Sequence, residues 1–122
     1  MIKKGYVYLA PVGYHLLVEL DQTLSLSVDP RVNYSRPSID VLFESAAYVL
    51  EEHCIGIVLT GANHDGSAGL RAIKRNGGLA IVQDPESAEY RMMPQSAIET
   101  TEVDYVLTLK EMGLFLQKLG QC

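Results

Sequence analysis

The sequence Ile55-Gly56-Ile57-Val58-Leu59-Thr60-Gly61-Ala62-Asn63-His64-Asp65-Gly66 passes from an apolar run into a polar, glycine-rich loop. The apolar run predicts a β-strand buried on both faces, as in a parallel sheet covered by helices. Residues 65–76 carry Leu70 and Ile73 at helical spacing and end at Gly77-Gly78, which predicts a helix. Ligands and chemistry collect where parallel strands end, because helix N-termini point free N–H groups there. We therefore expect a functional loop in which Asp65 takes part in chemistry.

The second half of the chain repeats this alternation of strand and helix. Residues 79–82 predict another buried strand, residues 94 to about 100 a helix that begins at a proline, and residues 105–107 a short strand. Thr108 is expected to cap a last helix with the apolar residues Met112, Leu116 and Leu119. This order predicts an α/β fold with a three-layer, mostly parallel, doubly wound (Rossmann-like) sheet.

The first half predicts β-structure followed by one helix. Residues 5–10 are rich in β-formers and stop at Pro11-Val12-Gly13, which suits a short strand ending in a turn. Residues 15–20 and 23–28 flank Asp21-Gln22 and predict a β-hairpin with one solvated face. After an irregular segment with two prolines, a helix to about residue 52 is predicted by the apolar stripe of Ile39, Leu42, Phe43, Ala46, Ala47 and Leu50.

Length and charge restrict the class of protein. The chain has 122 residues, of which 48% are hydrophobic and 20% charged, so it should fold as one domain or as part of one. Its formal net charge is −5, and no basic run is long enough to neutralise a row of phosphates. We therefore expect no nucleic-acid partner.

The apolar stretches and the cysteines indicate the compartment. No stretch approaches the roughly 20 apolar residues that cross a bilayer, and the N-terminus lacks the apolar region of a signal peptide. A cytoplasmic protein without membrane insertion is expected. Cys54 and Cys122 cannot form a disulfide framework, and Cys54 is interpreted as a small buried hydrophobe.

Other kinds of site compete for the loop at residues 59–66. Gly61 and Gly66 have the spacing of a P-loop, but Ser67-Ala68 stands where Lys-Ser/Thr is required, and the dinucleotide fingerprint also fails. His64 and Asp65 are adjacent and point in different directions, and no His-x-x-x-His or Cys-x-x-Cys pair adds ligands. We expect neither metal nor cofactor. Position alone leaves Asp65 open between catalysis and capping of the helix that follows.

Several separated motifs resemble the CheB-type protein-glutamate methylesterase domain. They keep the family's order and spacing over nearly the whole chain: Tyr6-Val7-Tyr8-Leu9-Ala10-Pro11 with Gly13 and His15, Arg36-Pro37-Ser38-Ile39-Asp40-Val41-Leu42-Phe43, Val58 to Gly66, Gln83-Asp84-Pro85 and Met93-Pro94. The resemblance implies a serine hydrolase of chemotaxis signalling. Such an enzyme removes methyl esters from glutamyl side chains of chemoreceptors and can deamidate receptor glutamines.

The resemblance also implies roles for two residues. The family uses a Ser-His-Asp triad whose aspartate lies in the Thr-Gly-x-x-x-Asp-Gly loop, here Asp65, where it would accept the imidazole N–H and stabilise the imidazolium. The backbone N–H of Ala62 matches a position that helps to bind the oxyanion. The family's nucleophile, in a Gly-Ala-Ser-x-Gly-Gly segment, and its histidine both precede the motif at Tyr6. No serine of this chain matches that nucleophile, and none of its histidines (His15, His53 and His64) matches the catalytic one.

We therefore expect residues 1–122 to be the C-terminal two-thirds of a CheB-type methylesterase domain, without the nucleophile-bearing segment or a receiver domain. Such an incomplete domain should be inactive alone. It should self-associate or pair with the missing segment, because a sheet edge and apolar helix-packing faces would be exposed. Two other functions stay open, a non-enzymatic interaction module of the same fold and a small-ligand α/β binding domain.

Overall fold

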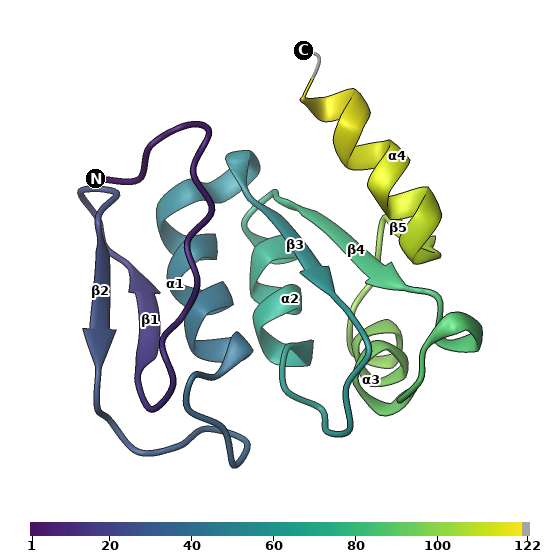
Figure 1. The fold of residues 1–122 in the computed structure, drawn as a ribbon, viewed down its shortest axis with the longest axis horizontal. Helices are drawn as coiled ribbons and strands as arrows, with labels where there is room; N and C mark the ends of the chain where they lie inside the picture. Colours follow the sequence, from purple (N-terminus) through teal and green to yellow (C-terminus); the bar gives the residue numbers. More distant parts are fainter. Residues whose placement is uncertain (121–122) are drawn as a thin grey trace.

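The structure is a computed structural model that describes residues 1–120, so Cys122 lies outside the described residues. Its elements follow one another as shown in Figure 1: β1 (His15–Val18), β2 (Leu24–Ser27), α1 (Ile39–Leu50), η1 (Glu51–His53), β3 (Ile55–Val58), α2 (Ser67–Arg75), β4 (Leu79–Gln83), η2 (Pro85–Ser87), α3 (Met92–Thr100), β5 (Tyr105–Leu107) and α4 (Leu109–Leu119). Both the predicted hairpin and the predicted alternation of strand and helix are confirmed.

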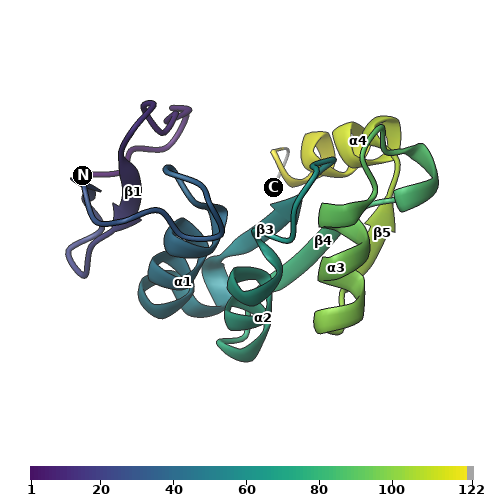
Figure 2. The same cartoon turned by 90° about the horizontal axis from the view of Figure 1, so that it is seen from below.

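A parallel sheet forms the centre of the fold. Its order is β3-β4-β5, with Ile55 opposite Leu79 and Ile81 opposite Tyr105. Helices α1, α2 and α3, which we call the helical layer, cover one face, and α4 lies on the other face (Figure 2). The predicted three-layer α/β class is therefore confirmed. The antiparallel hairpin β1–β2 forms a separate sheet beside α1, and the Val18 N–H donates to Ser45 Oγ at 2.9 Å.

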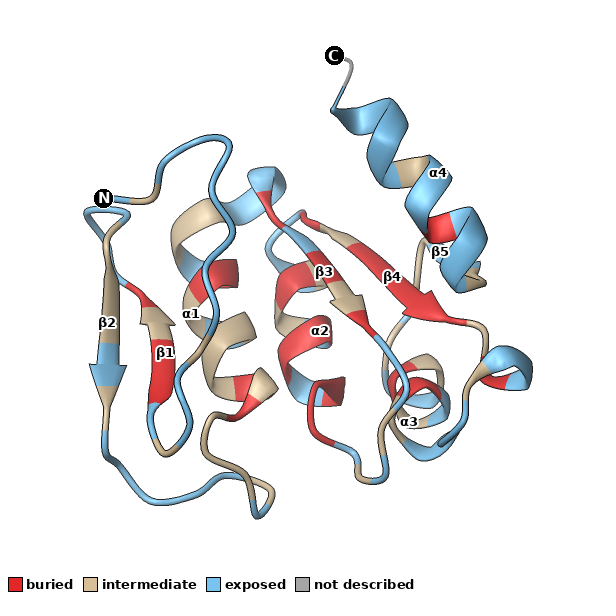
Figure 3. Cartoon of the chain, viewed as in Figure 1, coloured by how far each residue is buried: buried red, intermediate tan, exposed pale blue. Residues whose placement is uncertain are grey.

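Two clusters of buried apolar side chains hold these layers together (Figure 3). One joins the hairpin, α1 and α2, and the other joins α2 and α3 to the sheet; their buried members are Val18, Ala46, Ala47, Cys54 and Ile73 in the first and Val58, Leu70, Ala80, Val82 and Ala97 in the second. Cys54 is buried as expected, and this burial raises the pKa of its thiol. The thiol stays protonated and packs as an apolar group.

The first turns of α1 and α2 approach each other closely because α2 has a glycine at the contact. A Cβ added to Gly69 would lie 2.5 Å from Phe43 Cβ and 3.1 Å from Asp40 Cα. No side chain fits between the two helices at this point. The glycine thus brings the N-termini of α1 and α2 together, at the end of the sheet where β3 and β4 finish (Figure 1).

Two predictions about strands are wrong. Residues 5–10 form no strand, because their backbone finds no partner strand, and β-propensity alone does not supply one. Strand β3 is not buried on both faces, since Ile55 is 41% exposed and Ile57 is only partly buried. Its Gly56 and Val58 face α2, whereas Ile55 and Ile57 lie on the opposite face of the strand.

Candidate active site

The loop between β3 and α2 is held by backbone contacts to the segment before α3. The Gly61 N–H donates to the Tyr90 carbonyl and the Gly61 carbonyl accepts from the Met93 N–H, both at 3.1 Å. The Thr60 N–H donates to Oε1 of the buried Gln83 at 2.9 Å. These bonds explain why the loop lies beyond the carboxyl ends of β3 and β4. Asn63 Oδ1 then accepts from the Asp65 N–H at 2.8 Å and turns the chain into α2.

Asp65 points its carboxylate at the N-terminus of α1 and away from its own helix. Its Oδ2 accepts from the Ile39 N–H at 2.6 Å, and its Oδ1 accepts from Ser38 Oγ at 2.8 Å and from the Asp40 N–H at 3.2 Å. The residue is only 2% exposed. Of the two alternatives left open for Asp65, capping of the helix that follows it is therefore wrong, because the cap of α2 is Gly66 and has no side-chain hydrogen bond.

Asp40 makes the reciprocal contact. Its Oδ1 accepts from the Gly66 N–H at 3.0 Å and from the Gly69 N–H at 2.7 Å, in the first turn of α2. Each helix thus receives at its positive end a carboxylate that belongs to the other segment. We call this arrangement the carboxylate exchange. Burial and the negative charge of Asp40 together raise the pKa of Glu44, one turn further along α1.

Asn33 joins the two carboxylates. Its side-chain Nδ2 donates to Asp40 Oδ2 at 2.7 Å and to Asp65 Oδ1 at 3.0 Å. A neutral donor between two buried carboxylates offsets part of their repulsion and fixes the rotamer of each. The side-chain orientation of Asp65 therefore depends on a residue in the irregular segment before α1.

His15 and Ser38 lie close to Asp65, but they do not form a triad with it. Ser38 Oγ donates to the carboxylate, whereas a nucleophile must donate to an imidazole. The His15 ring accepts the Ser38 N–H on Nδ1 at 3.2 Å, so its proton is on Nε2, which donates to the Pro30 carbonyl at 3.0 Å. With His15 1% exposed and both ring nitrogens engaged by backbone, the ring has no access to substrate.

Ala62 lies at the exposed tip of the same loop. Its backbone N–H makes no hydrogen bond to residues 1–120, so it can donate to an incoming oxygen atom. The side chain of His64 is exposed, as expected. Within the described part of the chain, no three His, Cys, Asp or Glu side chains come close enough to hold a metal ion.

The sequence motifs contained the partners of Asp65 without indicating their roles. Ser38 and Asp40 belong to the motif that begins at Arg36, and Asn33 lies in the irregular segment before it, for which the sequence indicates no role. An Asp two residues after a Ser before a helix is an ordinary start signal. Only the contact with Gly66 and Gly69 shows that Asp40 serves a second helix.

The fold and the site define a doubly wound α/β domain with a buried, hydrogen-bonded aspartate where a parallel strand ends. Residues 1–116 match the model of a protein family described as CheB methylesterase. The chain belongs to this family.

Solved and curated relatives agree with this assignment. The CheB methylesterase catalytic domain of Thermotoga maritima superimposes with a TM-score of 0.91 at 32% identity, over 97% of this chain and 64% of that one. A Leptospira interrogans relative is 59% identical over 98% of this chain, and its name assigns it provisionally to the protein-glutamate methylesterases/protein-glutamine glutaminases. FrzG of Myxococcus xanthus, named a protein-glutamate methylesterase, is 38% identical over 97% of this chain.

This chain is shorter than the relatives that it matches. It spans 62% of the Leptospira protein and 35% of FrzG. No helix in residues 1–120 has the length and apolar character needed to cross a membrane.

Proposed function

We propose that this chain supplies the acidic member of the triad, Asp65, and an oxyanion donor, the Ala62 N–H, to a protein-glutamate methylesterase of chemotaxis signalling. One observation carries the proposal. The Asp65 carboxylate is held by several hydrogen bonds where a strand ends, yet among residues 1–120 only the Ile39 N–H donates to its Oδ2. A carboxylate oxygen has two lone pairs, so Oδ2 can still accept from an imidazole N–H.

In this mechanism Asp65 acts through the histidine. It holds the imidazole in the tautomer that takes the serine proton, and it stabilises the imidazolium formed as the serine attacks the glutamyl ester. The Ala62 N–H stabilises the oxyanion of the tetrahedral intermediate, and methanol leaves with the proton that the imidazole carries. The serine comes from the family's Gly-Ala-Ser-x-Gly-Gly segment, and the histidine follows a later strand. The substrates are methylated chemoreceptors, met in the cytoplasm.

Methanol release from a methylated receptor tests the proposal. We expect no release by residues 1–122 alone and release once the family's Ser- and His-bearing segment is fused ahead of residue 1. This comparison also separates hydrolysis from the non-enzymatic interaction module, which would bind receptor but never release methanol. Release by residues 1–122 alone would show that these residues contain the nucleophile, which the proposal assigns to another segment.

Asp65→Asn should lower the turnover of the fused domain about a thousandfold or more, because an amide cannot hold the imidazole in the required tautomer. The same substitution disturbs the carboxylate exchange, so its effect needs a matched control. Asp40→Asn disturbs the same contacts from the other side without touching the imidazole, and it should lose far less activity. Equal losses in the two variants would reduce Asp65 to a structural role.

A further inference from the structure

The tight turn at residues 32–35 lies directly beside the carboxylate exchange. Val32 and Ser35 exchange two backbone hydrogen bonds, of 3.0 and 2.9 Å, and close the turn. Its two central residues, Asn33 and Tyr34, both have positive φ, at 53° and 65°. This is the geometry of a type I′ turn, in which glycine is favoured and a bulky residue is an outlier.

The side chains of the two central residues point in opposite directions, one into the protein and one into solvent. Asn33 tolerates the left-handed conformation and directs its side chain inward, to Asp65 and Asp40. Tyr34 is 93% exposed. Within residues 1–120 its ring pairs with no other aromatic ring, and its hydroxyl makes no hydrogen bond. The tyrosine side chain therefore adds nothing to the fold at a position where it strains the backbone.

Strain of this kind is typical of functional sites, where the surrounding structure holds a residue in a rarely adopted conformation. A tyrosine is also a frequent anchor in protein interfaces, because it offers a rigid, amphipathic ring at low entropic cost. Tyr34 directly follows Asn33, whose Nδ2 lies 3.0 Å from Asp65 Oδ1. A receptor polypeptide whose glutamyl ester reaches the serine also covers the surface around the imidazole that Asp65 orients, and the turn at residues 32–35 lies beside Asp65.

We propose that Tyr34 is a substrate-docking residue that contacts the receptor polypeptide beside the glutamyl ester, and that the turn at residues 32–35 holds it there. The identity of this partner rests on the proposed function. Because Asn33 connects the turn to the catalytic carboxylate, a receptor segment docked on Tyr34 is held at a fixed place relative to Asp65.

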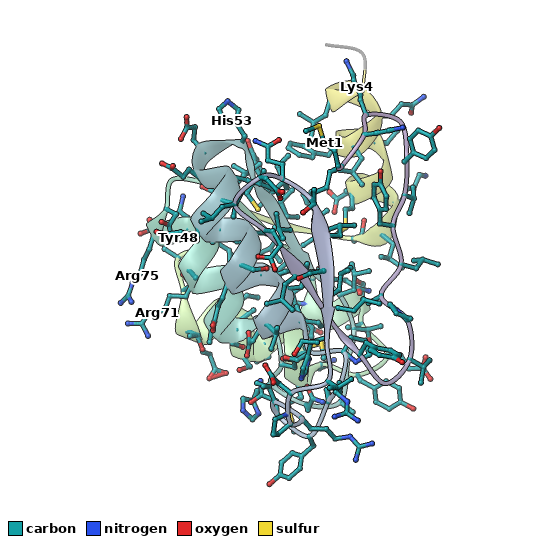
Figure 4. All side chains as sticks on the ribbon, turned by 90° about the vertical axis from the view of Figure 1, so that its left-hand side faces the viewer. Met1, Lys4, Tyr48, His53, Arg71 and Arg75 are labelled. Carbon is teal, nitrogen blue, oxygen red and sulfur yellow. The ribbon has the colours of Figure 1, made fainter. Side chains whose placement is uncertain are left out.

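Titration calorimetry with residues 1–122 and a fully methylated cytoplasmic chemoreceptor fragment from the same genome tests this inference. Tyr34→Gly should weaken binding about tenfold, as for an aromatic anchor. Its melting temperature should be unchanged or higher, since glycine adopts the turn without strain. The matched control is Tyr48→Ala, which removes a 70% exposed tyrosine of α1 that projects from the helical layer with Arg71 and Arg75 (Figure 4). It should leave the affinity unchanged.

Equal binding by Tyr34→Gly and the unsubstituted chain would overturn the inference, and so would an unsubstituted chain that does not bind the fragment. A loss of affinity accompanied by a lower melting temperature would also overturn it, because Tyr34 would then support the fold. Binding that depends on Tyr34, together with a fused domain that never releases methanol, would instead overturn only the proposed function.

Discussion

At the scale of single residues, Asp65 both stabilises a helix N-terminus and is a candidate catalyst. Its carboxylate accepts N–H groups at the start of α1, whose cap residue is Ser38, and Asp40 of α1 accepts N–H groups at the start of α2 in return. A triad aspartate must stay ionised and correctly oriented while an imidazolium forms beside it. The backbone and side-chain donors around Asp65 fix the orientation of its carboxylate. In the proposed mechanism, the hydrogen bonds that stabilise the start of α1 also orient the triad aspartate.

Asp40→Ala should lower the free energy of unfolding by about 3 kcal/mol, because it leaves the buried Gly66 and Gly69 N–H groups without an acceptor. Urea denaturation of residues 1–122 measures this change. Asp29→Ala removes an exposed carboxylate whose side chain makes no hydrogen bond within the described residues, and it should change stability by less than about 0.5 kcal/mol. Similar values for both variants would contradict the carboxylate exchange.

At the scale of elements, the approach of α1 to α2 positions the site. The N-termini of both helices meet at one end of the sheet, and each brings a carboxylate for the other (Figure 1). This geometry depends on Gly69, since a side chain there would push the helices apart. Helix α4 carries a comparable glycine, Gly113, with no atom within 4 Å of its missing Cβ.

Gly69→Ala and Gly113→Ala should therefore have opposite effects. The first forces a methyl group against Phe43 and the backbone of α1, and it should destabilise the chain by about 2 kcal/mol. The second improves helix propensity in open space and should stabilise it by about 0.5–1 kcal/mol. Thermal unfolding followed by circular dichroism measures both changes. A neutral Gly69→Ala would show that the two helices can separate without cost.

At the scale of the whole molecule, apolar surface is exposed around strand β3. Within residues 1–120, β3 pairs with β4 on one side only, and its other edge is free. Several large apolar residues of β3, of the loop after it and of α4 are exposed; they are Ile55, Leu59, Leu114 and Leu116. A free edge next to apolar side chains is a template for pairing with another chain.

We accordingly expect residues 1–122 to self-associate with increasing concentration in sedimentation experiments, and the family's Ser- and His-bearing segment to suppress this. Ile55→Lys should weaken the association, because a charge on an edge strand opposes pairing. Tyr48→Lys adds the same charge on the helical layer and should have no effect. A single monomeric species at every concentration would contradict the expectation.

Local patterns in the sequence were sufficient for most of the secondary structure. The strand at residues 55–58, the end of α2 before the glycines at 77 and 78 and the cap at Thr108 depend on near neighbours, and these elements are confirmed, although the strand is not buried on both faces. The motifs also led to the CheB methylesterase family. The prediction of a strand at residues 5–10 is wrong because a strand needs a partner strand, which no local pattern supplies.

Only the tertiary structure shows which residues form hydrogen bonds with Asp65. Asp65 lies 25 residues from Asp40 and 32 residues from Asn33 along the chain, so neither helical nor strand periodicity relates them. The carboxylate of Asp65 reaches α1 and not the helix that follows it, which its position in the loop did not indicate. Packing of α1 against α2 at Gly69 brought these groups together, and packing is a property of the folded chain.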